Sequence, residues 1–173
     1  MFITGGARSG KSVFAEKLAL EFGSSLCYLA TAQALDSEMD ERIVLHRERR
    51  GEQWHTLEEP LDLPRVLKEC DGRYQVILVD CITLWLSNLL FAYEGLEGNL
   101  EERILVDVRQ LADRLLEMKT AVILVSNEVG MGIVPENALA RLYRDMAGKA
   151  NQLLAVAADE VHMVISGIPL RLK

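Results

Sequence analysis

Residues Gly5 to Ser12 have the composition and spacing of a phosphate-binding loop, G-x-x-x-x-G-K-[ST]. Glycines let the backbone wrap closely enough for successive N–H groups to face one phosphate. Lys11 would bring a positive charge to the outer phosphates, and the Ser12 hydroxyl is a ligand of the kind that Mg²⁺ accepts. The predicted phosphate-binding positions are Gly5, Gly6, Ala7, Arg8, Ser9, Gly10, Lys11 and Ser12.

The neighbours of this loop suit a P-loop. The apolar run Met1–Thr4 predicts a short strand before it, and Val13–Leu20 has helical spacing after it. A helix beginning at about Lys11 would also point its positive dipole end at the anion. The alternative is a glycine- and serine-rich turn that contains Gly-Lys-Ser by chance, and the strand and helix on either side argue against it.

Asp80 is the second candidate for the metal site. It ends the apolar run Tyr74–Asp80, which predicts a buried strand. In P-loop proteins a carboxylate at such a strand end lies near the Mg²⁺ that the loop serine holds. Many strands end in aspartate, so Asp80 alone is a weak signal. The P-loop with Ser12 strengthens the prediction.

His46 lies in a charged stretch that predicts a helix over residues 36–50. Arg42, Arg49 and Arg50 share its face at spacings of three and four, and Arg47 lies beside it. Such a cluster would bind an anion and favour the neutral imidazole that a nucleophile requires. The alternative is a solvated helix whose glutamates pair with the arginines, and helical spacing alone favours that alternative.

Several polar residues follow predicted strands. Thr31, Ala32 and Gln33 leave the strand Leu26–Ala30, at the kind of strand end where α/β sheets bind ligands. They equally suit an ordinary connection. Glu58 could take a ribose hydroxyl or a metal, or merely precede a helix as first-turn charge. Trp54 could stack on a base, although a half-buried anchor is the commoner role.

Apolar runs alternate with helical patterns, which predicts an α/β domain over residues 1–173 with a mostly parallel sheet. The C-terminal strand is expected to be an antiparallel edge strand. Besides the strands above, we expect strands at Ala121–Val125, Val161–Ser166 and Leu170–Lys173. We expect helices at Leu61–Cys70, Cys81–Leu90, Leu100–Met118 and Glu136–Ala158. The apolar helix Cys81–Leu90 could belong to the core or to a subunit contact.

Bulk composition limits the function classes. The net charge of −7 argues against non-specific nucleic-acid binding. The longest apolar run, Ile82–Tyr93, is too short to cross a bilayer. Three cysteines without CxxC spacing, and no signal peptide, predict reduced thiols in a cytoplasmic protein.

Taken in order, the motifs resemble those of the bifunctional cobinamide kinase / cobinamide-phosphate guanylyltransferases of cobalamin biosynthesis. The resemblance covers essentially the whole chain. It is carried by Gly5–Ser12, Ala30–Gln33, Glu38–Met39, Arg42–Ile43, His46–Arg47, Trp54–Glu58, Asp80–Thr83, Asn127–Pro135, Arg144–Gly148 and Asn151–Gln152.

This resemblance implies phosphorylation of the aminopropanol hydroxyl of adenosylcobinamide, followed by transfer of GMP from GTP through a guanylylated histidine. That histidine falls on His46, which favours the anion-site interpretation of its helix. The implied nucleotide contacts are the P-loop, Thr31, Ala32, Gln33, Arg47, Glu48, Arg49, Arg50, Glu58 and Asp80. The resemblance also implies a RecA-like P-loop fold, Mg²⁺ held by Ser12 and Asp80, GTP and ATP as substrates, a corrinoid partner and a homotrimer.

Two other functions are compatible with the P-loop. A small-molecule kinase without a covalent step would release only ADP as its nucleotide product. A non-enzymatic GTP-binding switch would use the glycine-containing loop Ser126–Pro135 to report its nucleotide state.

Overall fold

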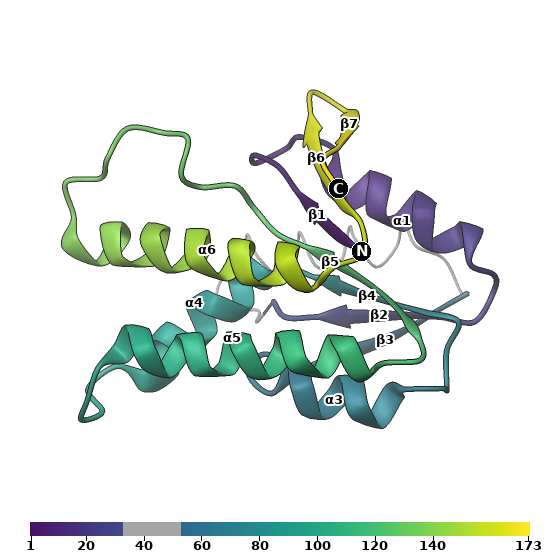
Figure 1. Cartoon of the computed structure of the whole chain (residues 1–173), viewed down its shortest axis with the longest axis horizontal. Coiled ribbons are helices and arrows are strands. Elements are labelled where there is room, and N and C mark those ends of the chain that lie inside the picture. Colours follow the sequence, from purple (N-terminus) through teal and green to yellow (C-terminus); the bar gives the residue numbers. More distant parts are fainter. Residues whose placement is uncertain (33–52) are drawn as a thin grey trace.

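The computed structural model describes residues 1–32 and 53–173. The predicted helix over residues 36–50, with His46 and Arg47–Arg50, lies outside the described residues, as does Gln33. In the described part, the chain forms one seven-stranded sheet with helices on both faces (Figure 1).

The sheet follows the order β3-β2-β4-β5-β1-β6-β7. All neighbouring strands are parallel except β6 and β7, which pair antiparallel at the edge. This confirms the predicted α/β class with its antiparallel C-terminal edge strand. The strands are β1 (Phe2–Thr4), β2 (Leu26–Ala30), β3 (Trp54–Glu58), β4 (Val76–Asp80), β5 (Ala121–Val125), β6 (Val161–Ile165) and β7 (Ile168–Arg171).

Helices divide unevenly between the two faces of the sheet. α1 (Lys11–Glu21) packs against β1, β4 and β5 on one face. The opposite face carries α3, α4, α5 and α6 (Figure 1), and α5 contacts each of the other three. Their bounds are α3 (Leu63–Cys70), α4 (Ile82–Tyr93), α5 (Leu100–Glu117) and α6 (Ala138–Ala157).

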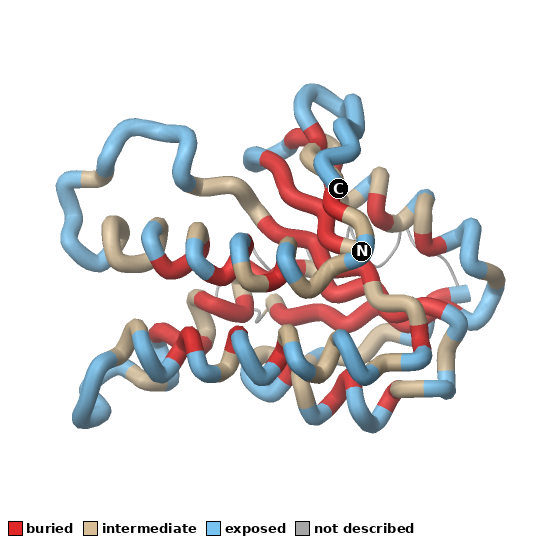
Figure 2. The backbone as a smooth tube through the Cα atoms, viewed as in Figure 1, coloured by how far each residue is buried: buried red, intermediate tan, exposed pale blue. Residues whose placement is uncertain are grey.

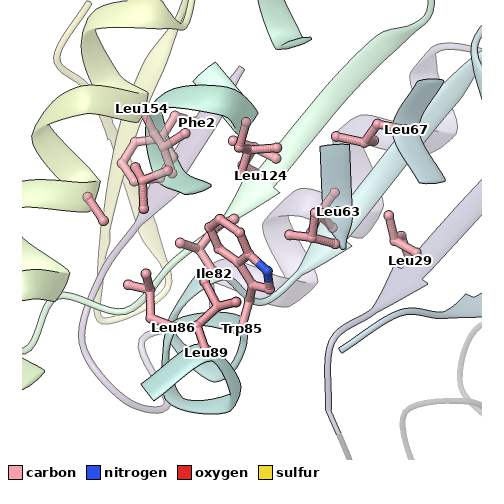
Figure 3. Packing of buried hydrophobic residues seen from close by; sticks show 14 of the residues in the cluster. Phe2, Leu29, Leu63, Leu67, Ile82, Trp85, Leu86, Leu89, Leu124 and Leu154 are labelled. Atoms are coloured by element: carbon pink, nitrogen blue, oxygen red, sulfur yellow. The ribbon is translucent and has the colours of Figure 1, made fainter. Parts of the chain in front are cut away.

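The larger core lies under these four helices. Trp85 and Leu86 of α4 are fully buried there beside Ile82, with Phe2 of β1 and Leu124 of β5 in the same cluster (Figure 3). From the sequence, the helix expected at Cys81–Leu90 could have belonged either to the core or to a subunit contact. The structure shows that it belongs to the core. Figure 2 shows the same pattern, with buried residues along the central strands and exposed residues on the outer helix faces.

Some expected boundaries were wrong by a few residues. α3 begins at Leu63 rather than Leu61 because Asp62 caps it, accepting a hydrogen bond from the Arg65 N–H at 3.2 Å. α6 likewise begins at Ala138 rather than Glu136, because the Asn137 side chain caps its first turn.

The turn between β6 and β7 was also misplaced. The strands expected at Val161–Ser166 and Leu170–Lys173 would leave residues 167–169 as the turn. It is instead made by Ser166 and Gly167, which have φ values of 52° and 82°. Positive φ at both central residues is the geometry of a tight two-residue hairpin. Pro169 then lies within β7, which it can do because an edge strand leaves one side unpaired.

Candidate active site

The P-loop joins β1 to α1 as the sequence predicts. Residues 5–10 of the loop lie between Thr4 and the first helical residue, Lys11, so Lys11 and Ser12 already belong to α1. Gly10 has φ 94°, a left-handed conformation that favours glycine. Gly5 has no room for a side chain, because a Cβ there would lie 2.4 Å from the Val164 carbonyl oxygen.

Neighbouring segments hold the loop through its carbonyl groups. The Gly5 carbonyl accepts from the Glu128 N–H at 3.0 Å, and the Ser9 carbonyl from the Gly167 N–H at 2.8 Å. Within the described residues, the backbone N–H groups of Ala7, Arg8 and Gly10 have no protein acceptor. These three donors are therefore available to an anion, whereas the Ser9 N–H donates to the Gly6 carbonyl at 3.2 Å.

Two side chains in the loop region lack the partners that a bound phosphate would supply. The Ser9 hydroxyl is buried without a hydrogen-bond partner in the described part of the chain. The Lys11 ammonium donates to the Gly6 carbonyl at 3.0 Å, within its own loop. Burial lowers the pKa of Lys11, while Cys81 and Asp80 act in the opposite direction. A buried cation near an orphaned hydroxyl suits a polyphosphate.

Strand register brings the other predicted residues to the same edge. Glu58 lies opposite Ala30, Ala30 opposite Asp80, and Asp80 opposite Val125. Val125 lies opposite Ile3, two residues before the P-loop. Thr31, Asp80 and the P-loop therefore share the carboxyl edge of the sheet, while Glu58 ends the outer strand and is exposed.

Asp80 is held by a neighbouring strand. One of its carboxylate oxygens accepts from the Tyr28 hydroxyl at 3.0 Å, and the residue is only partly buried. The described residues contain no cluster of three or more His, Cys, Asp or Glu side chains that could hold a metal by themselves. Ser12 and Asp80 still suit Mg²⁺, which proteins commonly bind with few ligands and complete with substrate phosphates and water.

The connection from β4 to α4 contains a buried polar network. The Thr31 hydroxyl accepts from the Cys81 N–H at 2.8 Å and donates to the Cys81 carbonyl at 2.7 Å. The Cys81 thiol lies 3.0 Å from the Thr83 hydroxyl. Burial raises the pKa of the Cys81 thiol to about 11, so it is neutral at physiological pH and is not a nucleophile there.

Two residues of this network were not singled out as site residues from the sequence. The Asn127 amide nitrogen donates to the Thr83 hydroxyl at 2.6 Å and lies 3.9 Å from the Cys81 sulfur. A sequence signal did exist, since Thr83 interrupts an apolar helix and Asn127 lies two residues beyond an apolar strand. Neither pattern identifies a partner, because the two residues are 44 positions apart.

Trp54 and His55 do not belong to the site. Trp54 is buried at the start of β3, at the opposite end of the strand from Glu58, and packs edge-on against Tyr28. It therefore cannot stack on a base bound at the carboxyl edge. His55 stacks on Tyr74, whose hydroxyl lies 2.7 Å from its Nδ1.

No helix among the described residues combines the length and apolar character needed to cross a membrane.

Comparison with known proteins gives relatives that match over nearly the full length of the chain. The bifunctional adenosylcobalamin biosynthesis proteins CobU of Escherichia coli K12 and CobP of Pseudomonas aeruginosa PAO1 are 43% and 45% identical to this chain. These alignments cover 100% and 99% of this chain, and 99% and 95% of the relatives. CobU of Salmonella typhimurium LT2 is 43% identical, covering 100% of this chain and 99% of the relative.

Among solved structures there is a weaker likeness to the VirB11 ATPase of the Brucella suis type IV secretion system, in complex with sulphate. It is 14% identical with a TM-score of 0.47, over 99% of this chain and 48% of that chain. This likeness is too weak to bear on function. A family model, described as cobinamide kinase / cobinamide phosphate guanyltransferase, matches residues 1–172, and the chain therefore belongs to that family.

Proposed function

We propose that this chain phosphorylates adenosylcobinamide with ATP or GTP and then transfers GMP from GTP to adenosylcobinamide phosphate. The second reaction passes through guanylylated His46 and yields adenosylcobinamide-GDP and pyrophosphate. The observation that carries this proposal is a P-loop at the same sheet edge as Asp80, in a member of this family, whose Ala7, Arg8 and Gly10 N–H groups have no acceptor among the described residues.

Triphosphate binding rests on Gly5–Ser12. The free N–H groups of Ala7, Arg8 and Gly10 would bind phosphate oxygens, and Lys11 would exchange the Gly6 carbonyl for an outer phosphate. Mg²⁺ would be held by Ser12 and Asp80, where it would neutralise charge on the phosphates. Thr31, Ala32, Gln33 and Glu58 complete the proposed nucleotide site.

The covalent step is assigned to His46. Its imidazole nitrogen attacks the α-phosphorus of GTP, the bond to the bridging oxygen breaks, and pyrophosphate leaves. A phosphate oxygen of adenosylcobinamide phosphate then attacks the same phosphorus and releases the imidazole. Arg47, Arg49 and Arg50 would neutralise the charge that develops on the transferring group, and Glu48 lies among them in sequence.

We further infer that residues 1–173 act as one nucleotide-binding domain in a cytoplasmic homotrimer. A corrinoid is its small-molecule acceptor, and neither nucleic acid nor a membrane is a partner. The acidic net charge of −7 is in keeping with the absence of a nucleic-acid partner.

The test is to incubate the protein with Mg²⁺ and GTP labelled in its α-phosphate, denature it, and look for label on the chain. We expect a phosphoramidate, stable in base and lost in acid, that maps to His46. The His46→Ala variant should carry no label and should retain kinase activity with cobinamide. The matched control is His55→Ala, which removes a histidine that stacks on Tyr74 and should keep the label.

Absence of label in wild-type protein that binds GTP would contradict the covalent mechanism. The protein would then be a plain small-molecule kinase if cobinamide were still phosphorylated. It would be a nucleotide switch if GTP bound without turnover on any corrinoid.

A further inference from the structure

Asn127 lies just beyond β5, at the carboxyl edge of the sheet. It follows β5, which lies between β1, the strand that enters the P-loop, and β4, the strand that ends in Asp80. The parallel ladder between β5 and β1 continues past the strands, since the Ser126 N–H donates to the Ile3 carbonyl and the Glu128 N–H to the Gly5 carbonyl. Asn127 therefore lies alongside the first residues of the P-loop.

The backbone of Asn127 is held by other elements. Its carbonyl accepts from the side-chain amide of Asn151 in α6 at 3.2 Å. The other end of the Asn151 amide accepts from the buried Ser126 hydroxyl at 2.7 Å. With Glu128 bonded to the P-loop, the chain is fixed on both sides of Asn127.

The side chain is also held at one end. Its amide nitrogen donates to Thr83, and Thr83 is itself buried and bonded to the Cys81 sulfur. The same amide nitrogen lies 3.9 Å from the sulfur of Cys81, the residue that directly follows Asp80 in the chain.

The other end of the amide has no partner among the described residues. Across residues 1–32 and 53–173, no donor bonds to the carbonyl oxygen Oδ1, and the side chain is only partly buried. An amide oxygen accepts hydrogen bonds and cannot donate one, so it cannot bind a phosphate oxygen. A hydroxyl that approaches the P-loop from this side is a donor that the oxygen can accept from.

We propose that Asn127 orients the acceptor in the kinase step: its Oδ1 accepts a hydrogen bond from the attacking hydroxyl of the corrinoid substrate. This proposal rests on the kinase half of the proposed function. The hydroxyl oxygen forms a bond to the γ-phosphorus, the bond from that phosphorus to the β–γ bridging oxygen breaks, and the nucleoside diphosphate leaves. The hydroxyl proton passes to an oxygen of the transferred phosphoryl group. Asn127 holds the hydroxyl in line and takes no proton.

The test separates the two reactions. Kinase activity is measured with cobinamide and ATP, and guanylyl transfer with GTP and cobinamide that is already phosphorylated. For Asn127→Ala we expect kinase kcat to fall about 100-fold, the size expected when a reactant is misplaced by about 1 Å. The KM for ATP and the rate of guanylyl transfer should each change by less than about threefold, since neither uses the oriented hydroxyl.

Two further variants examine the oxygen itself. Asn127→Asp keeps an acceptor oxygen that the Thr83 hydroxyl can hold by donating to it, so its kinase kcat should exceed that of Asn127→Ala at least tenfold. The control for loss of an amide elsewhere is Asn99→Ala, at the exposed cap of α5, which should leave both rates unchanged.

Equal losses in both reactions would overturn the proposal, because the amide would then serve the shared nucleotide site or the packing. Unchanged kinase activity would overturn it as well. If Asn127→Ala does not fold, Thr83→Val replaces it, since that variant keeps the amide but frees its nitrogen; we expect about a tenfold loss confined to the kinase step. If wild-type protein shows no guanylyl transfer, ATP affinity measured by calorimetry becomes the reference, and the kinase comparison stands.

Discussion

Two strand-to-helix connections form the candidate site, and they are built in opposite ways. Between β1 and α1, residues 5–10 form a loop in which the N–H groups of Ala7, Arg8 and Gly10 have no acceptor among the described residues. Between β4 and α4 there is only Cys81, which contacts the nearby Thr83 and two side chains from distant parts of the chain, those of Thr31 and Asn127. The first connection offers backbone geometry, and the second offers side-chain chemistry.

The two connections differ in how far apart in the sequence the residues that determine their structure lie. Glycine positions specify the P-loop within a few residues, because backbone freedom is a local property. The second connection depends on contacts across 44 to 50 positions of sequence, such as Thr31 with Cys81 and Thr83 with Asn127. Mutations in the two connections should therefore destabilise the protein for different reasons.

The largest effect on stability should come from Thr31→Val, which removes the hydroxyl that bonds to Cys81. This change deletes both hydrogen bonds to Cys81 and leaves the buried Cys81 N–H without an acceptor, whereas the Cys81 carbonyl keeps its bond from the Trp85 N–H. We expect the free energy of unfolding to fall by about 3 kcal/mol, measured by urea denaturation.

The matched control for Thr31→Val is Thr56→Val in β3, where no hydroxyl hydrogen bond is lost in the described structure. Its effect should be within about 0.5 kcal/mol. A similar loss in both variants would mean that the Thr31 hydroxyl contributes nothing specific to the β4–α4 connection.

A smaller effect should come from the local connection in Gly5→Ala. The added Cβ would lie 2.4 Å from the Val164 carbonyl and 2.7 Å from the Ser9 hydroxyl. Backbone must move to relieve the first contact, and we expect a loss of about 2 kcal/mol in the free energy of unfolding.

Gly6→Ala provides the control within the same loop, because a Cβ at Gly6 meets nothing within 4 Å. Its unfolding free energy should match that of the wild type in the same denaturation experiment. Equal stability of the Gly5 and Gly6 variants would show that close approach does not constrain this loop.

The smallest effect concerns the buried thiol of the β4–α4 connection. Burial raises the pKa of Cys81 from 9.0 to about 11. Between these values the folded protein keeps a proton that the unfolded chain releases, so stability falls as pH rises from 9 to 11. This one group should account for about 1 kcal/mol of lost stability between pH 8 and pH 10.

Comparing wild type with Cys81→Ser at both pH values isolates that contribution. The variant should lose about 1 kcal/mol less on going from pH 8 to pH 10, because serine does not ionise there. Cys27 and Cys70 also have raised pKa values, but they are present in both proteins and cancel. An identical decline in the two proteins would contradict the burial of the Cys81 thiol.

Much of the fold was predictable because its signals are local. The strands Leu26–Ala30 and Ala121–Val125 have the predicted bounds, since continuous apolar runs between turn residues specify buried strands. Helix starts were less accurate at α3 and α6, where Asp62 and Asn137 cap the helix and residues before them stay outside it. The predicted roles of His46 and its arginines stay predictions.

The sequence by itself determined the P-loop, the strand that ends in Asp80 and the alternation of strands and helices, because each depends on residues close together in the chain. Tertiary structure decided that β5 lies between β1 and β4, which places Asn127 beside both the P-loop and Thr83. It also decided that Trp54 lies away from the site and that Thr31 bonds to Cys81. The physical reason is that strand order and register set these distances, whereas a polar residue carries no local signal of the partner that it will meet.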